Sequence, residues 1–121
     1  MSRDFRKLRA FHLADDLVDD IYRVASGFPP EERYCLLGQL KRAAVSAPSN
    51  IVEGSARRTT AEFVNFVNIA AGSGAEARYL VEVSGRLGFV PKDETLQLTT
   101  RYTELQAQLQ ALMRSLRNPP S

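Results

Sequence analysis

The stretch that decides the fold class is residues 92–117, which read KDETLQLTTRYTELQAQLQALMRSLR. Apolar residues recur here at steps of four, three, four, three and four, namely Leu98, Tyr102, Leu105, Leu109, Leu112 and Leu116. Residues three and four apart share one face of an α-helix, so the spacing predicts an apolar stripe along one helix. Asn118-Pro119-Pro120 follows and cannot continue the helix. A stripe of this kind needs partner helices to cover it.

Three upstream segments show the same periodicity, and the sequence predicts helices at about residues 4–26, 31–57, 60–87 and 92–117. Two punctuated stretches, Gly27-Phe28-Pro29-Pro30 and Gly88-Phe89-Val90-Pro91, separate helices, and each glycine is expected to end its helix in the left-handed conformation. Thr59 and Glu62 form a capping-box pattern at the start of the third helix. With short connections and no alternating strand pattern, residues 1–121 predict one all-α domain, an antiparallel up-down-up-down four-helix bundle. The apolar stripe expected on the first helix is Leu8, Phe11, Ala14, Val18, Ile21 and Ala25.

Two predicted helices contain residues that disfavour helix. Pro48 removes one helical hydrogen bond, which predicts a kink or a short break near residues 44–48. Gly72 and Gly74 each cost about 1 kcal/mol relative to alanine, so either the third helix breaks there or close packing compensates. The third helix is also apolar on two sides, which predicts that its own bundle and a second partner both cover it.

Composition sets limits on the class of protein. The 121 residues are 44% hydrophobic and 25% charged, as in globular domains, and 16 basic against 14 acidic residues give a net charge of +2. Any role in binding nucleic acid must then come from local clustering of charge. No run of eighteen apolar residues is present, so no membrane span is expected, and the N-terminal residues lack the apolar run of a signal peptide. The single Cys35, expected to be packed, fits a reducing cytoplasm.

The residues that carry catalysis are scarce. His12 is the one histidine, so a Cys–His or Ser–His–Asp arrangement would require it to meet Cys35 or a serine in space. One histidine and one cysteine do not make a zinc site, and Gly72-Ser73-Gly74 lacks the remaining features of a dinucleotide-binding loop. We therefore expect no enzyme, no cofactor, no metal and no small-molecule substrate.

A polar stripe on the second predicted helix has two open interpretations. It consists of Gln39, Arg42, Ser46, Asn50, Glu53 and Arg57, at steps of three and four. It could be an ordinary solvated face. It could instead be a subunit interface, in which charged groups pair and small residues let helices approach, and Gly72 and Gly74 would belong to the same contact.

The segment 39–54, QLKRAAVSAPSNIVEG, resembles the 23S rRNA intervening-sequence protein family, also called the S23 family of bacterial four-helix bundle proteins. That family carries a pattern of the form Q-x-x-R-A-x-x-S-I-x-x-N-I-A-E-G. The resemblance extends over nearly the whole chain, through Phe28-Pro29, Phe63 with Phe66, Gly72-Ser73 and Gly88-Phe89. The chain departs from the family at Val52, at Phe11-His12, and at Ala71, where an arginine commonly precedes the Gly-Ser pair.

The resemblance implies a ring-shaped homopentamer with a central channel. It also implies kinship with the accessory proteins of diversity-generating retroelements, which bind nucleic acid and a reverse transcriptase. The expected partners are further copies of this chain, RNA or DNA, and a reverse-transcriptase-like protein, with no membrane partner. Two functions stay open: a nucleic-acid-binding module and a protein scaffold without nucleic acid. For the first, the candidate contacts are the clustered basic residues Arg6, Lys7, Arg9, Lys41, Arg42, Arg57 and Arg58.

Overall fold

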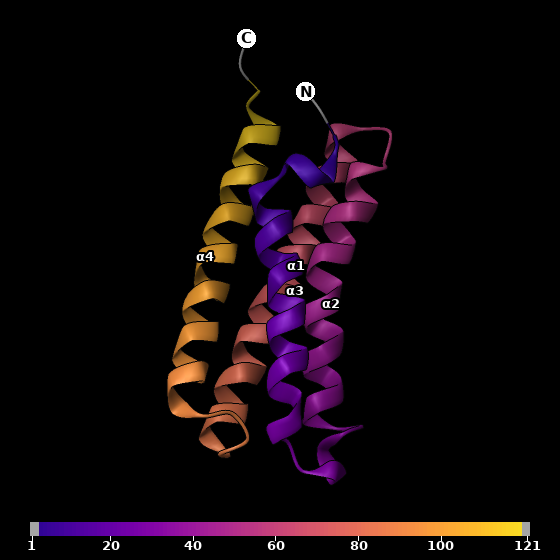
Figure 1. The fold of residues 1–121 in the computed structure, drawn as a ribbon. Coiled ribbons are helices and arrows are strands. Elements are labelled where there is room, and N and C mark those ends of the chain that lie inside the picture. Colours follow the sequence, from indigo (N-terminus) through magenta and orange to yellow (C-terminus); the bar gives the residue numbers. More distant parts are fainter. Residues whose placement is uncertain (1–2, 120–121) are drawn as a thin grey trace.

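A computed structural model of the chain describes residues 3–119 and shows four long helices (Figure 1). These are α1 at Arg9–Val24, α2 at Leu36–Ser55, α3 at Thr60–Arg86 and α4 at Lys92–Arg117. Three short 3-10 helices lie before and between them, η1 at Phe5–Lys7, η2 at Ala25–Gly27 and η3 at Pro30–Glu32. No strand occurs among residues 3–119, and none of their helices is long and apolar enough to cross a membrane. The predicted all-α fold is confirmed.

The long helices run antiparallel in sequence order, as the bundle prediction requires (Figure 1). α2 packs against α1 and α3, and α4 packs against α3 and α1. The start of the described chain, the α2–α3 connection and the end of α4 therefore lie at one end of the bundle (Figure 1). The α1–α2 and α3–α4 connections lie at the other end.

Two helices begin later than the sequence predicts, because a short 3-10 helix and a residue with non-helical dihedrals precede each of them. Asp4 accepts a hydrogen bond from the backbone N–H of Arg6 and caps the separate η1, and the extended Leu8 (φ −95°, ψ 124°) then separates η1 from α1. Pro30–Glu32 forms η3 instead of the first turn of α2. Cys35 has non-helical dihedrals (φ −115°, ψ −112°), so α2 begins after it.

The two glycine-containing connections differ from each other. Gly88 has a φ of 81°, as predicted for a left-handed helix end. Gly27 does not: among residues 3–119 Gly88 alone has positive φ, and Gly27 lies in η2. Glycine is needed at position 27 because of close packing, since a Cβ there would lie 2.5 Å from the backbone oxygen of Phe89. The Phe28 and Phe89 rings lie 5.4 Å apart, so the two connections pack directly on each other.

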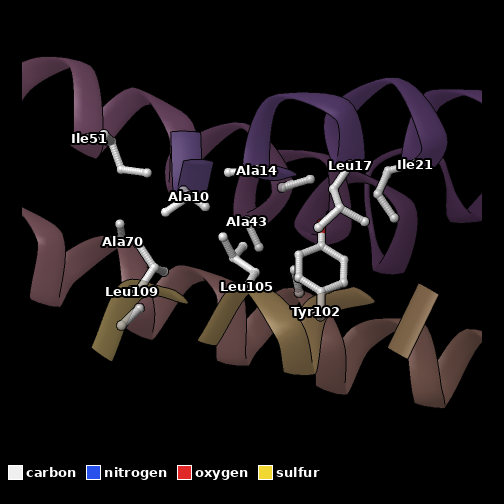
Figure 2. Packing of buried hydrophobic residues seen from close by; sticks show 14 of the residues in the cluster. Ala10, Ala14, Leu17, Ile21, Ala43, Ile51, Ala70, Tyr102, Leu105 and Leu109 are labelled. Carbon is white, nitrogen blue, oxygen red and sulfur yellow. The ribbon is translucent and has the colours of Figure 1, made fainter. Parts of the chain in front are cut away.

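The core runs along the whole bundle between the four helices, with side chains interdigitating as Figure 2 shows. The stripe of α4 follows the prediction except that Met113 is buried and Leu112 is half-buried. The predicted stripe of α1 is shifted, because Leu8, Phe11, Val18 and Ala25 are only partly buried. The α1 residues in the core are Ala10, Ala14, Leu17, Ile21 and Val24.

Both helices with unfavourable residues stay continuous. The sequence predicts a kink or a short break near Pro48; α2 shows no break there, and Pro48 is itself buried. The burial of its neighbours Ala47 and Ile51 offsets the one missing hydrogen bond. α3 runs through Gly74 because α4 fills the space: a Cβ there would overlap the amide of Gln106, whose Nε2 donates to the Ala71 carbonyl at 2.8 Å.

One polar contact joins α1 to α4. The carboxylate of Asp20 accepts from Arg101 of α4 and from Arg23 at 2.7 Å. The hydrogen bond from Arg23 to Asp20 has the largest effect and raises the pKa of Arg23. The attraction between the guanidinium and the negative charge of Asp20 raises it further. Tyr102, next to Arg101, is 1% exposed, and its ring extends from α4 toward Leu17 of α1 (Figure 2).

Candidate subunit interface and nucleic-acid surface

The polar stripe of α2 is partly used inside the chain. Ser46 and Ser73 of α3 share a hydrogen bond of 2.8 Å between their hydroxyls. Asn50 donates from Nδ2 to the Ser46 carbonyl at 2.8 Å and to its hydroxyl at 3.0 Å. All three side chains are half-buried. The small polar residues at the middle of the stripe therefore tie α2 to α3.

The two ends of the stripe face solvent in the isolated chain. Gln39 and Arg42 are exposed and line a polar hollow of about 360 Å³ together with Ser46, Ser73 and Glu76. At the other end, the exposed pair Glu53 and Arg57 lies at 2.8 Å. The Arg57 guanidinium also lies over the Phe66 ring, 4.7 Å from its centroid. Arg42 is therefore open to a second molecule, whereas Glu53 and Arg57 already pair with each other.

The solvent side of α3 carries apolar and small residues at helical spacing. Ile69 and Tyr79 are 45% and 57% exposed. Between them lies Gly72, whose missing Cβ would meet no atom within 4 Å. Gly72 thus differs from Gly74, which is buried against α4. Nothing in the described chain accounts for a glycine at position 72.

One apolar side of α3 is covered within the bundle, and the second is covered only in part, since Ala75 and Arg78 on that side are exposed. α3 lies between α2 and α4, and its buried residues face both of them. Val64 and Ala71, on the second apolar side, are buried. Ala71 stands where the family pattern has an arginine, and here its carbonyl accepts the Gln106 side chain. The apolar circumference of α3 therefore does not by itself require another subunit.

The predicted basic residues fall into two groups. Arg6, Lys7 and Arg9 at the start of the chain lie at the same bundle end as Arg57 and Arg58 (Figure 1). Lys41 and Arg42 lie apart from them, in the half of α2 near the opposite end. The Lys41 ammonium lies 4.7 Å from the centroid of the Tyr22 ring, a cation–π contact inside the chain.

Three further arginines at the first bundle end are not among the predicted contacts. Arg3 donates to the Arg57 carbonyl at 2.5 Å and to the Thr60 hydroxyl at 3.1 Å. Arg114 and Arg117 lie in the last turn of α4. An even number of antiparallel helices brings the end of α4 beside the start of the chain. The prediction of four antiparallel helices was therefore enough to place these arginines at the same end of the bundle as the basic residues at the start of the chain.

The histidine and the cysteine lie at opposite ends of the bundle, His12 in the first turn of α1 and Cys35 just before α2. The His12 ring nitrogen Nε2 hydrogen-bonds the Arg6 carbonyl at 2.6 Å. Cys35 is exposed, so the prediction of a packed thiol was wrong. The turn before α2 points its side chain outward. Among residues 3–119, no group of three or more His, Cys, Asp or Glu is placed to hold a metal.

Comparison with known proteins gives a family and a fold. Residues 6–111 match the model of the 23S rRNA-intervening sequence protein family. A similar solved structure is a protein with unknown function from the S23 ribosomal protein family of Bacteroides thetaiotaomicron VPI-5482. It superposes with a TM-score of 0.79 at 20% identity, over 87% of this chain and 98% of that one. No curated protein matches the sequence.

Proposed function

The chain belongs to the 23S rRNA-intervening sequence protein family, and we propose that it is a cytoplasmic, non-enzymatic homopentamer that binds nucleic acid through basic residues repeated around the ring. The observation that carries the proposal is that most of the candidate basic side chains form no ion pair with an acidic residue of the described chain. Of the seven candidate residues, Arg57 alone forms an ion pair with an acidic residue within the described part of the chain. The other six have no acidic ion-pair partner within residues 3–119.

Assembly is supported by the surface that α2 and α3 form together. A mid-helix glycine costs about 1 kcal/mol relative to alanine, and Gly72 recovers none of this through packing in its own chain. The exposed Ile69 and Tyr79 on either side supply apolar area. Close approach of a helix from a second subunit at Gly72 would use all three residues. The charged ends of the α2 stripe would then lie beside the contact.

The test of assembly is light scattering on a sizing column. A pentamer of this chain has about five times the mass of the 13.5 kDa protomer. A monomer at micromolar concentration would refute assembly. A dimer or a tetramer would refute the pentamer and leave a subunit interface in place.

The test of nucleic-acid binding is fluorescence anisotropy with a labelled single-stranded RNA over increasing salt. Contacts to phosphate release counterions, so the logarithm of the affinity should fall linearly with the logarithm of salt concentration. The exposed Tyr22 and Tyr34 each have a basic side chain over the ring, and stacking on an aromatic ring tolerates every base, so we expect no sequence preference. Absence of binding at about 50 mM salt would refute this function and favour a protein scaffold.

A further inference from the structure

Three segments that are far apart in the sequence form one end of the bundle, which we call the basic end. It consists of residues 3–9, 53–62 and 114–119, where the chain start, the α2–α3 connection and the end of α4 meet (Figure 1). These segments contain eight basic and three acidic residues. The opposite end, residues 20–36 and 82–94, contains four basic and six acidic residues. The small net charge of the chain therefore conceals a separation of charge along the bundle axis.

Direct contacts hold the three segments together. Arg3 bonds both the Arg57 carbonyl at the end of α2 and the Thr60 hydroxyl at the start of α3. Thr60 and Arg117 in turn line one hollow of about 350 Å³ between α3 and α4. The arginines of all three segments are thus neighbours on one surface.

The acidic residues of the basic end are already engaged in local contacts. Asp4 caps η1, Glu53 pairs with Arg57, and Glu62 accepts a hydrogen bond from the Thr59 hydroxyl at 2.9 Å. By contrast, Arg58, Arg114 and Arg117 are exposed, and none of them has an ion-pair partner within residues 3–119. These three are the charges best placed to meet a phosphate.

Lys41 and Arg42 lie outside this surface. Lys41 is half-buried over the Tyr22 ring. Arg42 lines the polar hollow that also contains the carboxylate of Glu76, which opposes the approach of a phosphate. Their position along α2 places them toward the end of the bundle with the acidic excess.

We propose that the basic end is the nucleic-acid site of this protein, that Arg58, Arg114 and Arg117 contact the phosphodiester backbone, and that Lys41 and Arg42 do not. This inference rests on the proposed function and assigns its location. In a closed cyclic ring, rotation carries each basic end onto the next at the same height along the axis. The basic ends of all subunits then form one continuous positive face, on which a single strand meets several sites at once.

The experiment compares three charge-reversal variants with the wild-type assembly. The basic-end variant is Arg58→Glu with Arg114→Glu and Arg117→Glu. The first control, Lys41→Glu with Arg42→Glu, reverses the two basic residues outside the site. The second, Arg86→Glu with Lys92→Glu, reverses charge at the opposite end. Binding of single-stranded RNA, and of DNA of the same sequence, is followed by anisotropy from about 50 to 200 mM salt. Circular dichroism and light scattering monitor fold and assembly.

The basic-end variant should bind at least about tenfold more weakly at the lowest salt, and its salt slope should become shallower by about 0.7 for each phosphate that the variant no longer neutralises. Both controls should keep the wild-type slope. If the reversed variant fails to fold or assemble, the neutral Arg58→Gln, Arg114→Gln, Arg117→Gln variant provides the same comparison with a smaller decrease in affinity.

Two outcomes would overturn the inference. Wild-type binding that the basic-end variants leave unchanged, or that the Lys41 and Arg42 reversals abolish while the assembly stays intact, would place the site elsewhere while the proposed function stands. No binding by the wild type would refute both together.

Discussion

Among single residues, Tyr102 places a hydroxyl in the core that its surroundings do not satisfy. This hydroxyl is buried and has no hydrogen-bond partner within the described part of the chain. Burial raises the pKa of Tyr102 above its usual value, and the nearby charge of Asp20 raises it further. The ring fills a large share of the core between α4 and α1, so packing accounts for its presence and the oxygen contributes little.

Tyr102→Phe should therefore leave the free energy of unfolding at pH 7 unchanged or raise it by up to about 1 kcal/mol. The pH dependence has a definite sign. An unfolded tyrosine loses its proton near pH 10, whereas folded Tyr102 keeps it to higher pH, so the unfolded state binds fewer protons above pH 10. The contribution of Tyr102 is fully present below that pH and is lost as pH rises through the folded pKa.

Urea unfolding of the two proteins between pH 7 and 11 checks this prediction. The wild type should lose stability relative to Tyr102→Phe above about pH 10. Tyr34→Phe, at a position that is 83% exposed, is the control for the removal of one tyrosine. A drop in stability of more than about 1 kcal/mol for Tyr102→Phe at pH 7 would mean that the hydroxyl is satisfied after all.

Gly72 and Gly74 of α3 give a second test on single residues. In the unassembled protomer, Gly72→Ala should raise the free energy of unfolding by about 1 kcal/mol, because the new methyl meets nothing in its own chain. Gly74→Ala should be less stable than Gly72→Ala, since its methyl displaces Gln106 and breaks that residue's bond to Ala71. Urea midpoints at one protein concentration compare the two. Equal midpoints would contradict the assigned packing of Gly74.

At the level of helices, the ends depend on specific side chains while the interiors tolerate unfavourable residues. α2 continues through Pro48 and α3 through two glycines, because packing on neighbouring helices outweighs the local cost. The start of α3 follows a short connection, with Arg57, Arg58 and Thr59 between α2 and α3 exposed to solvent. The capping hydrogen bonds at the start of α3 therefore receive little support from packed side chains.

Thr59→Ala should lower the free energy of unfolding by about 1 kcal/mol, because the hydroxyl accepts from the Glu62 backbone N–H at 3.1 Å and donates to the Glu62 carboxylate. Thr100→Ala, at an exposed position inside α4, is the matched control and should not destabilise. The measurement is thermal unfolding by circular dichroism. A Thr59→Ala variant as stable as the control would show that the capping box contributes nothing.

For the molecule as a whole, the main question is how the stripe on α2 behaves on assembly. In the isolated chain the Glu53–Arg57 pair is exposed, and such pairs are worth at most about 1 kcal/mol. If the pair becomes buried between subunits, removing one partner costs about 3 to 5 kcal/mol, because the other charge is left uncompensated. The effect of one substitution on assembly thus reports the environment of the stripe.

Glu53→Ala should weaken assembly far more than Glu31→Ala, which removes an exposed carboxylate from η3 at the opposite end of the bundle. Dilution series followed by light scattering would measure both. Small and equal effects would identify the stripe as a solvated face in the assembled protein.

Local sequence is sufficient to predict that this protein has four helices, but not where α1 and α2 begin. Helical periodicity and capping involve neighbouring residues, so the existence of four helices, the capping box at Thr59 and the left-handed Gly88 all follow from short stretches of the chain. Which face of α1 enters the core does not follow from the local sequence, because α1 carries two overlapping apolar stripes. Packing against α2 and α4 selects the stripe that contains Leu17.

Contacts between distant segments depend on the tertiary structure. Phe89 approaches position 27 so closely that only glycine fits there, and the side chain of Gln106 closely approaches position 74. Neither contact can be recognised from the neighbouring sequence. The same holds for the candidate site. The sequence shows small separate clusters of basic residues, and the antiparallel path of four helices brings Arg3, Arg58 and Arg117 to one end, because each helix reverses the direction of the one before it.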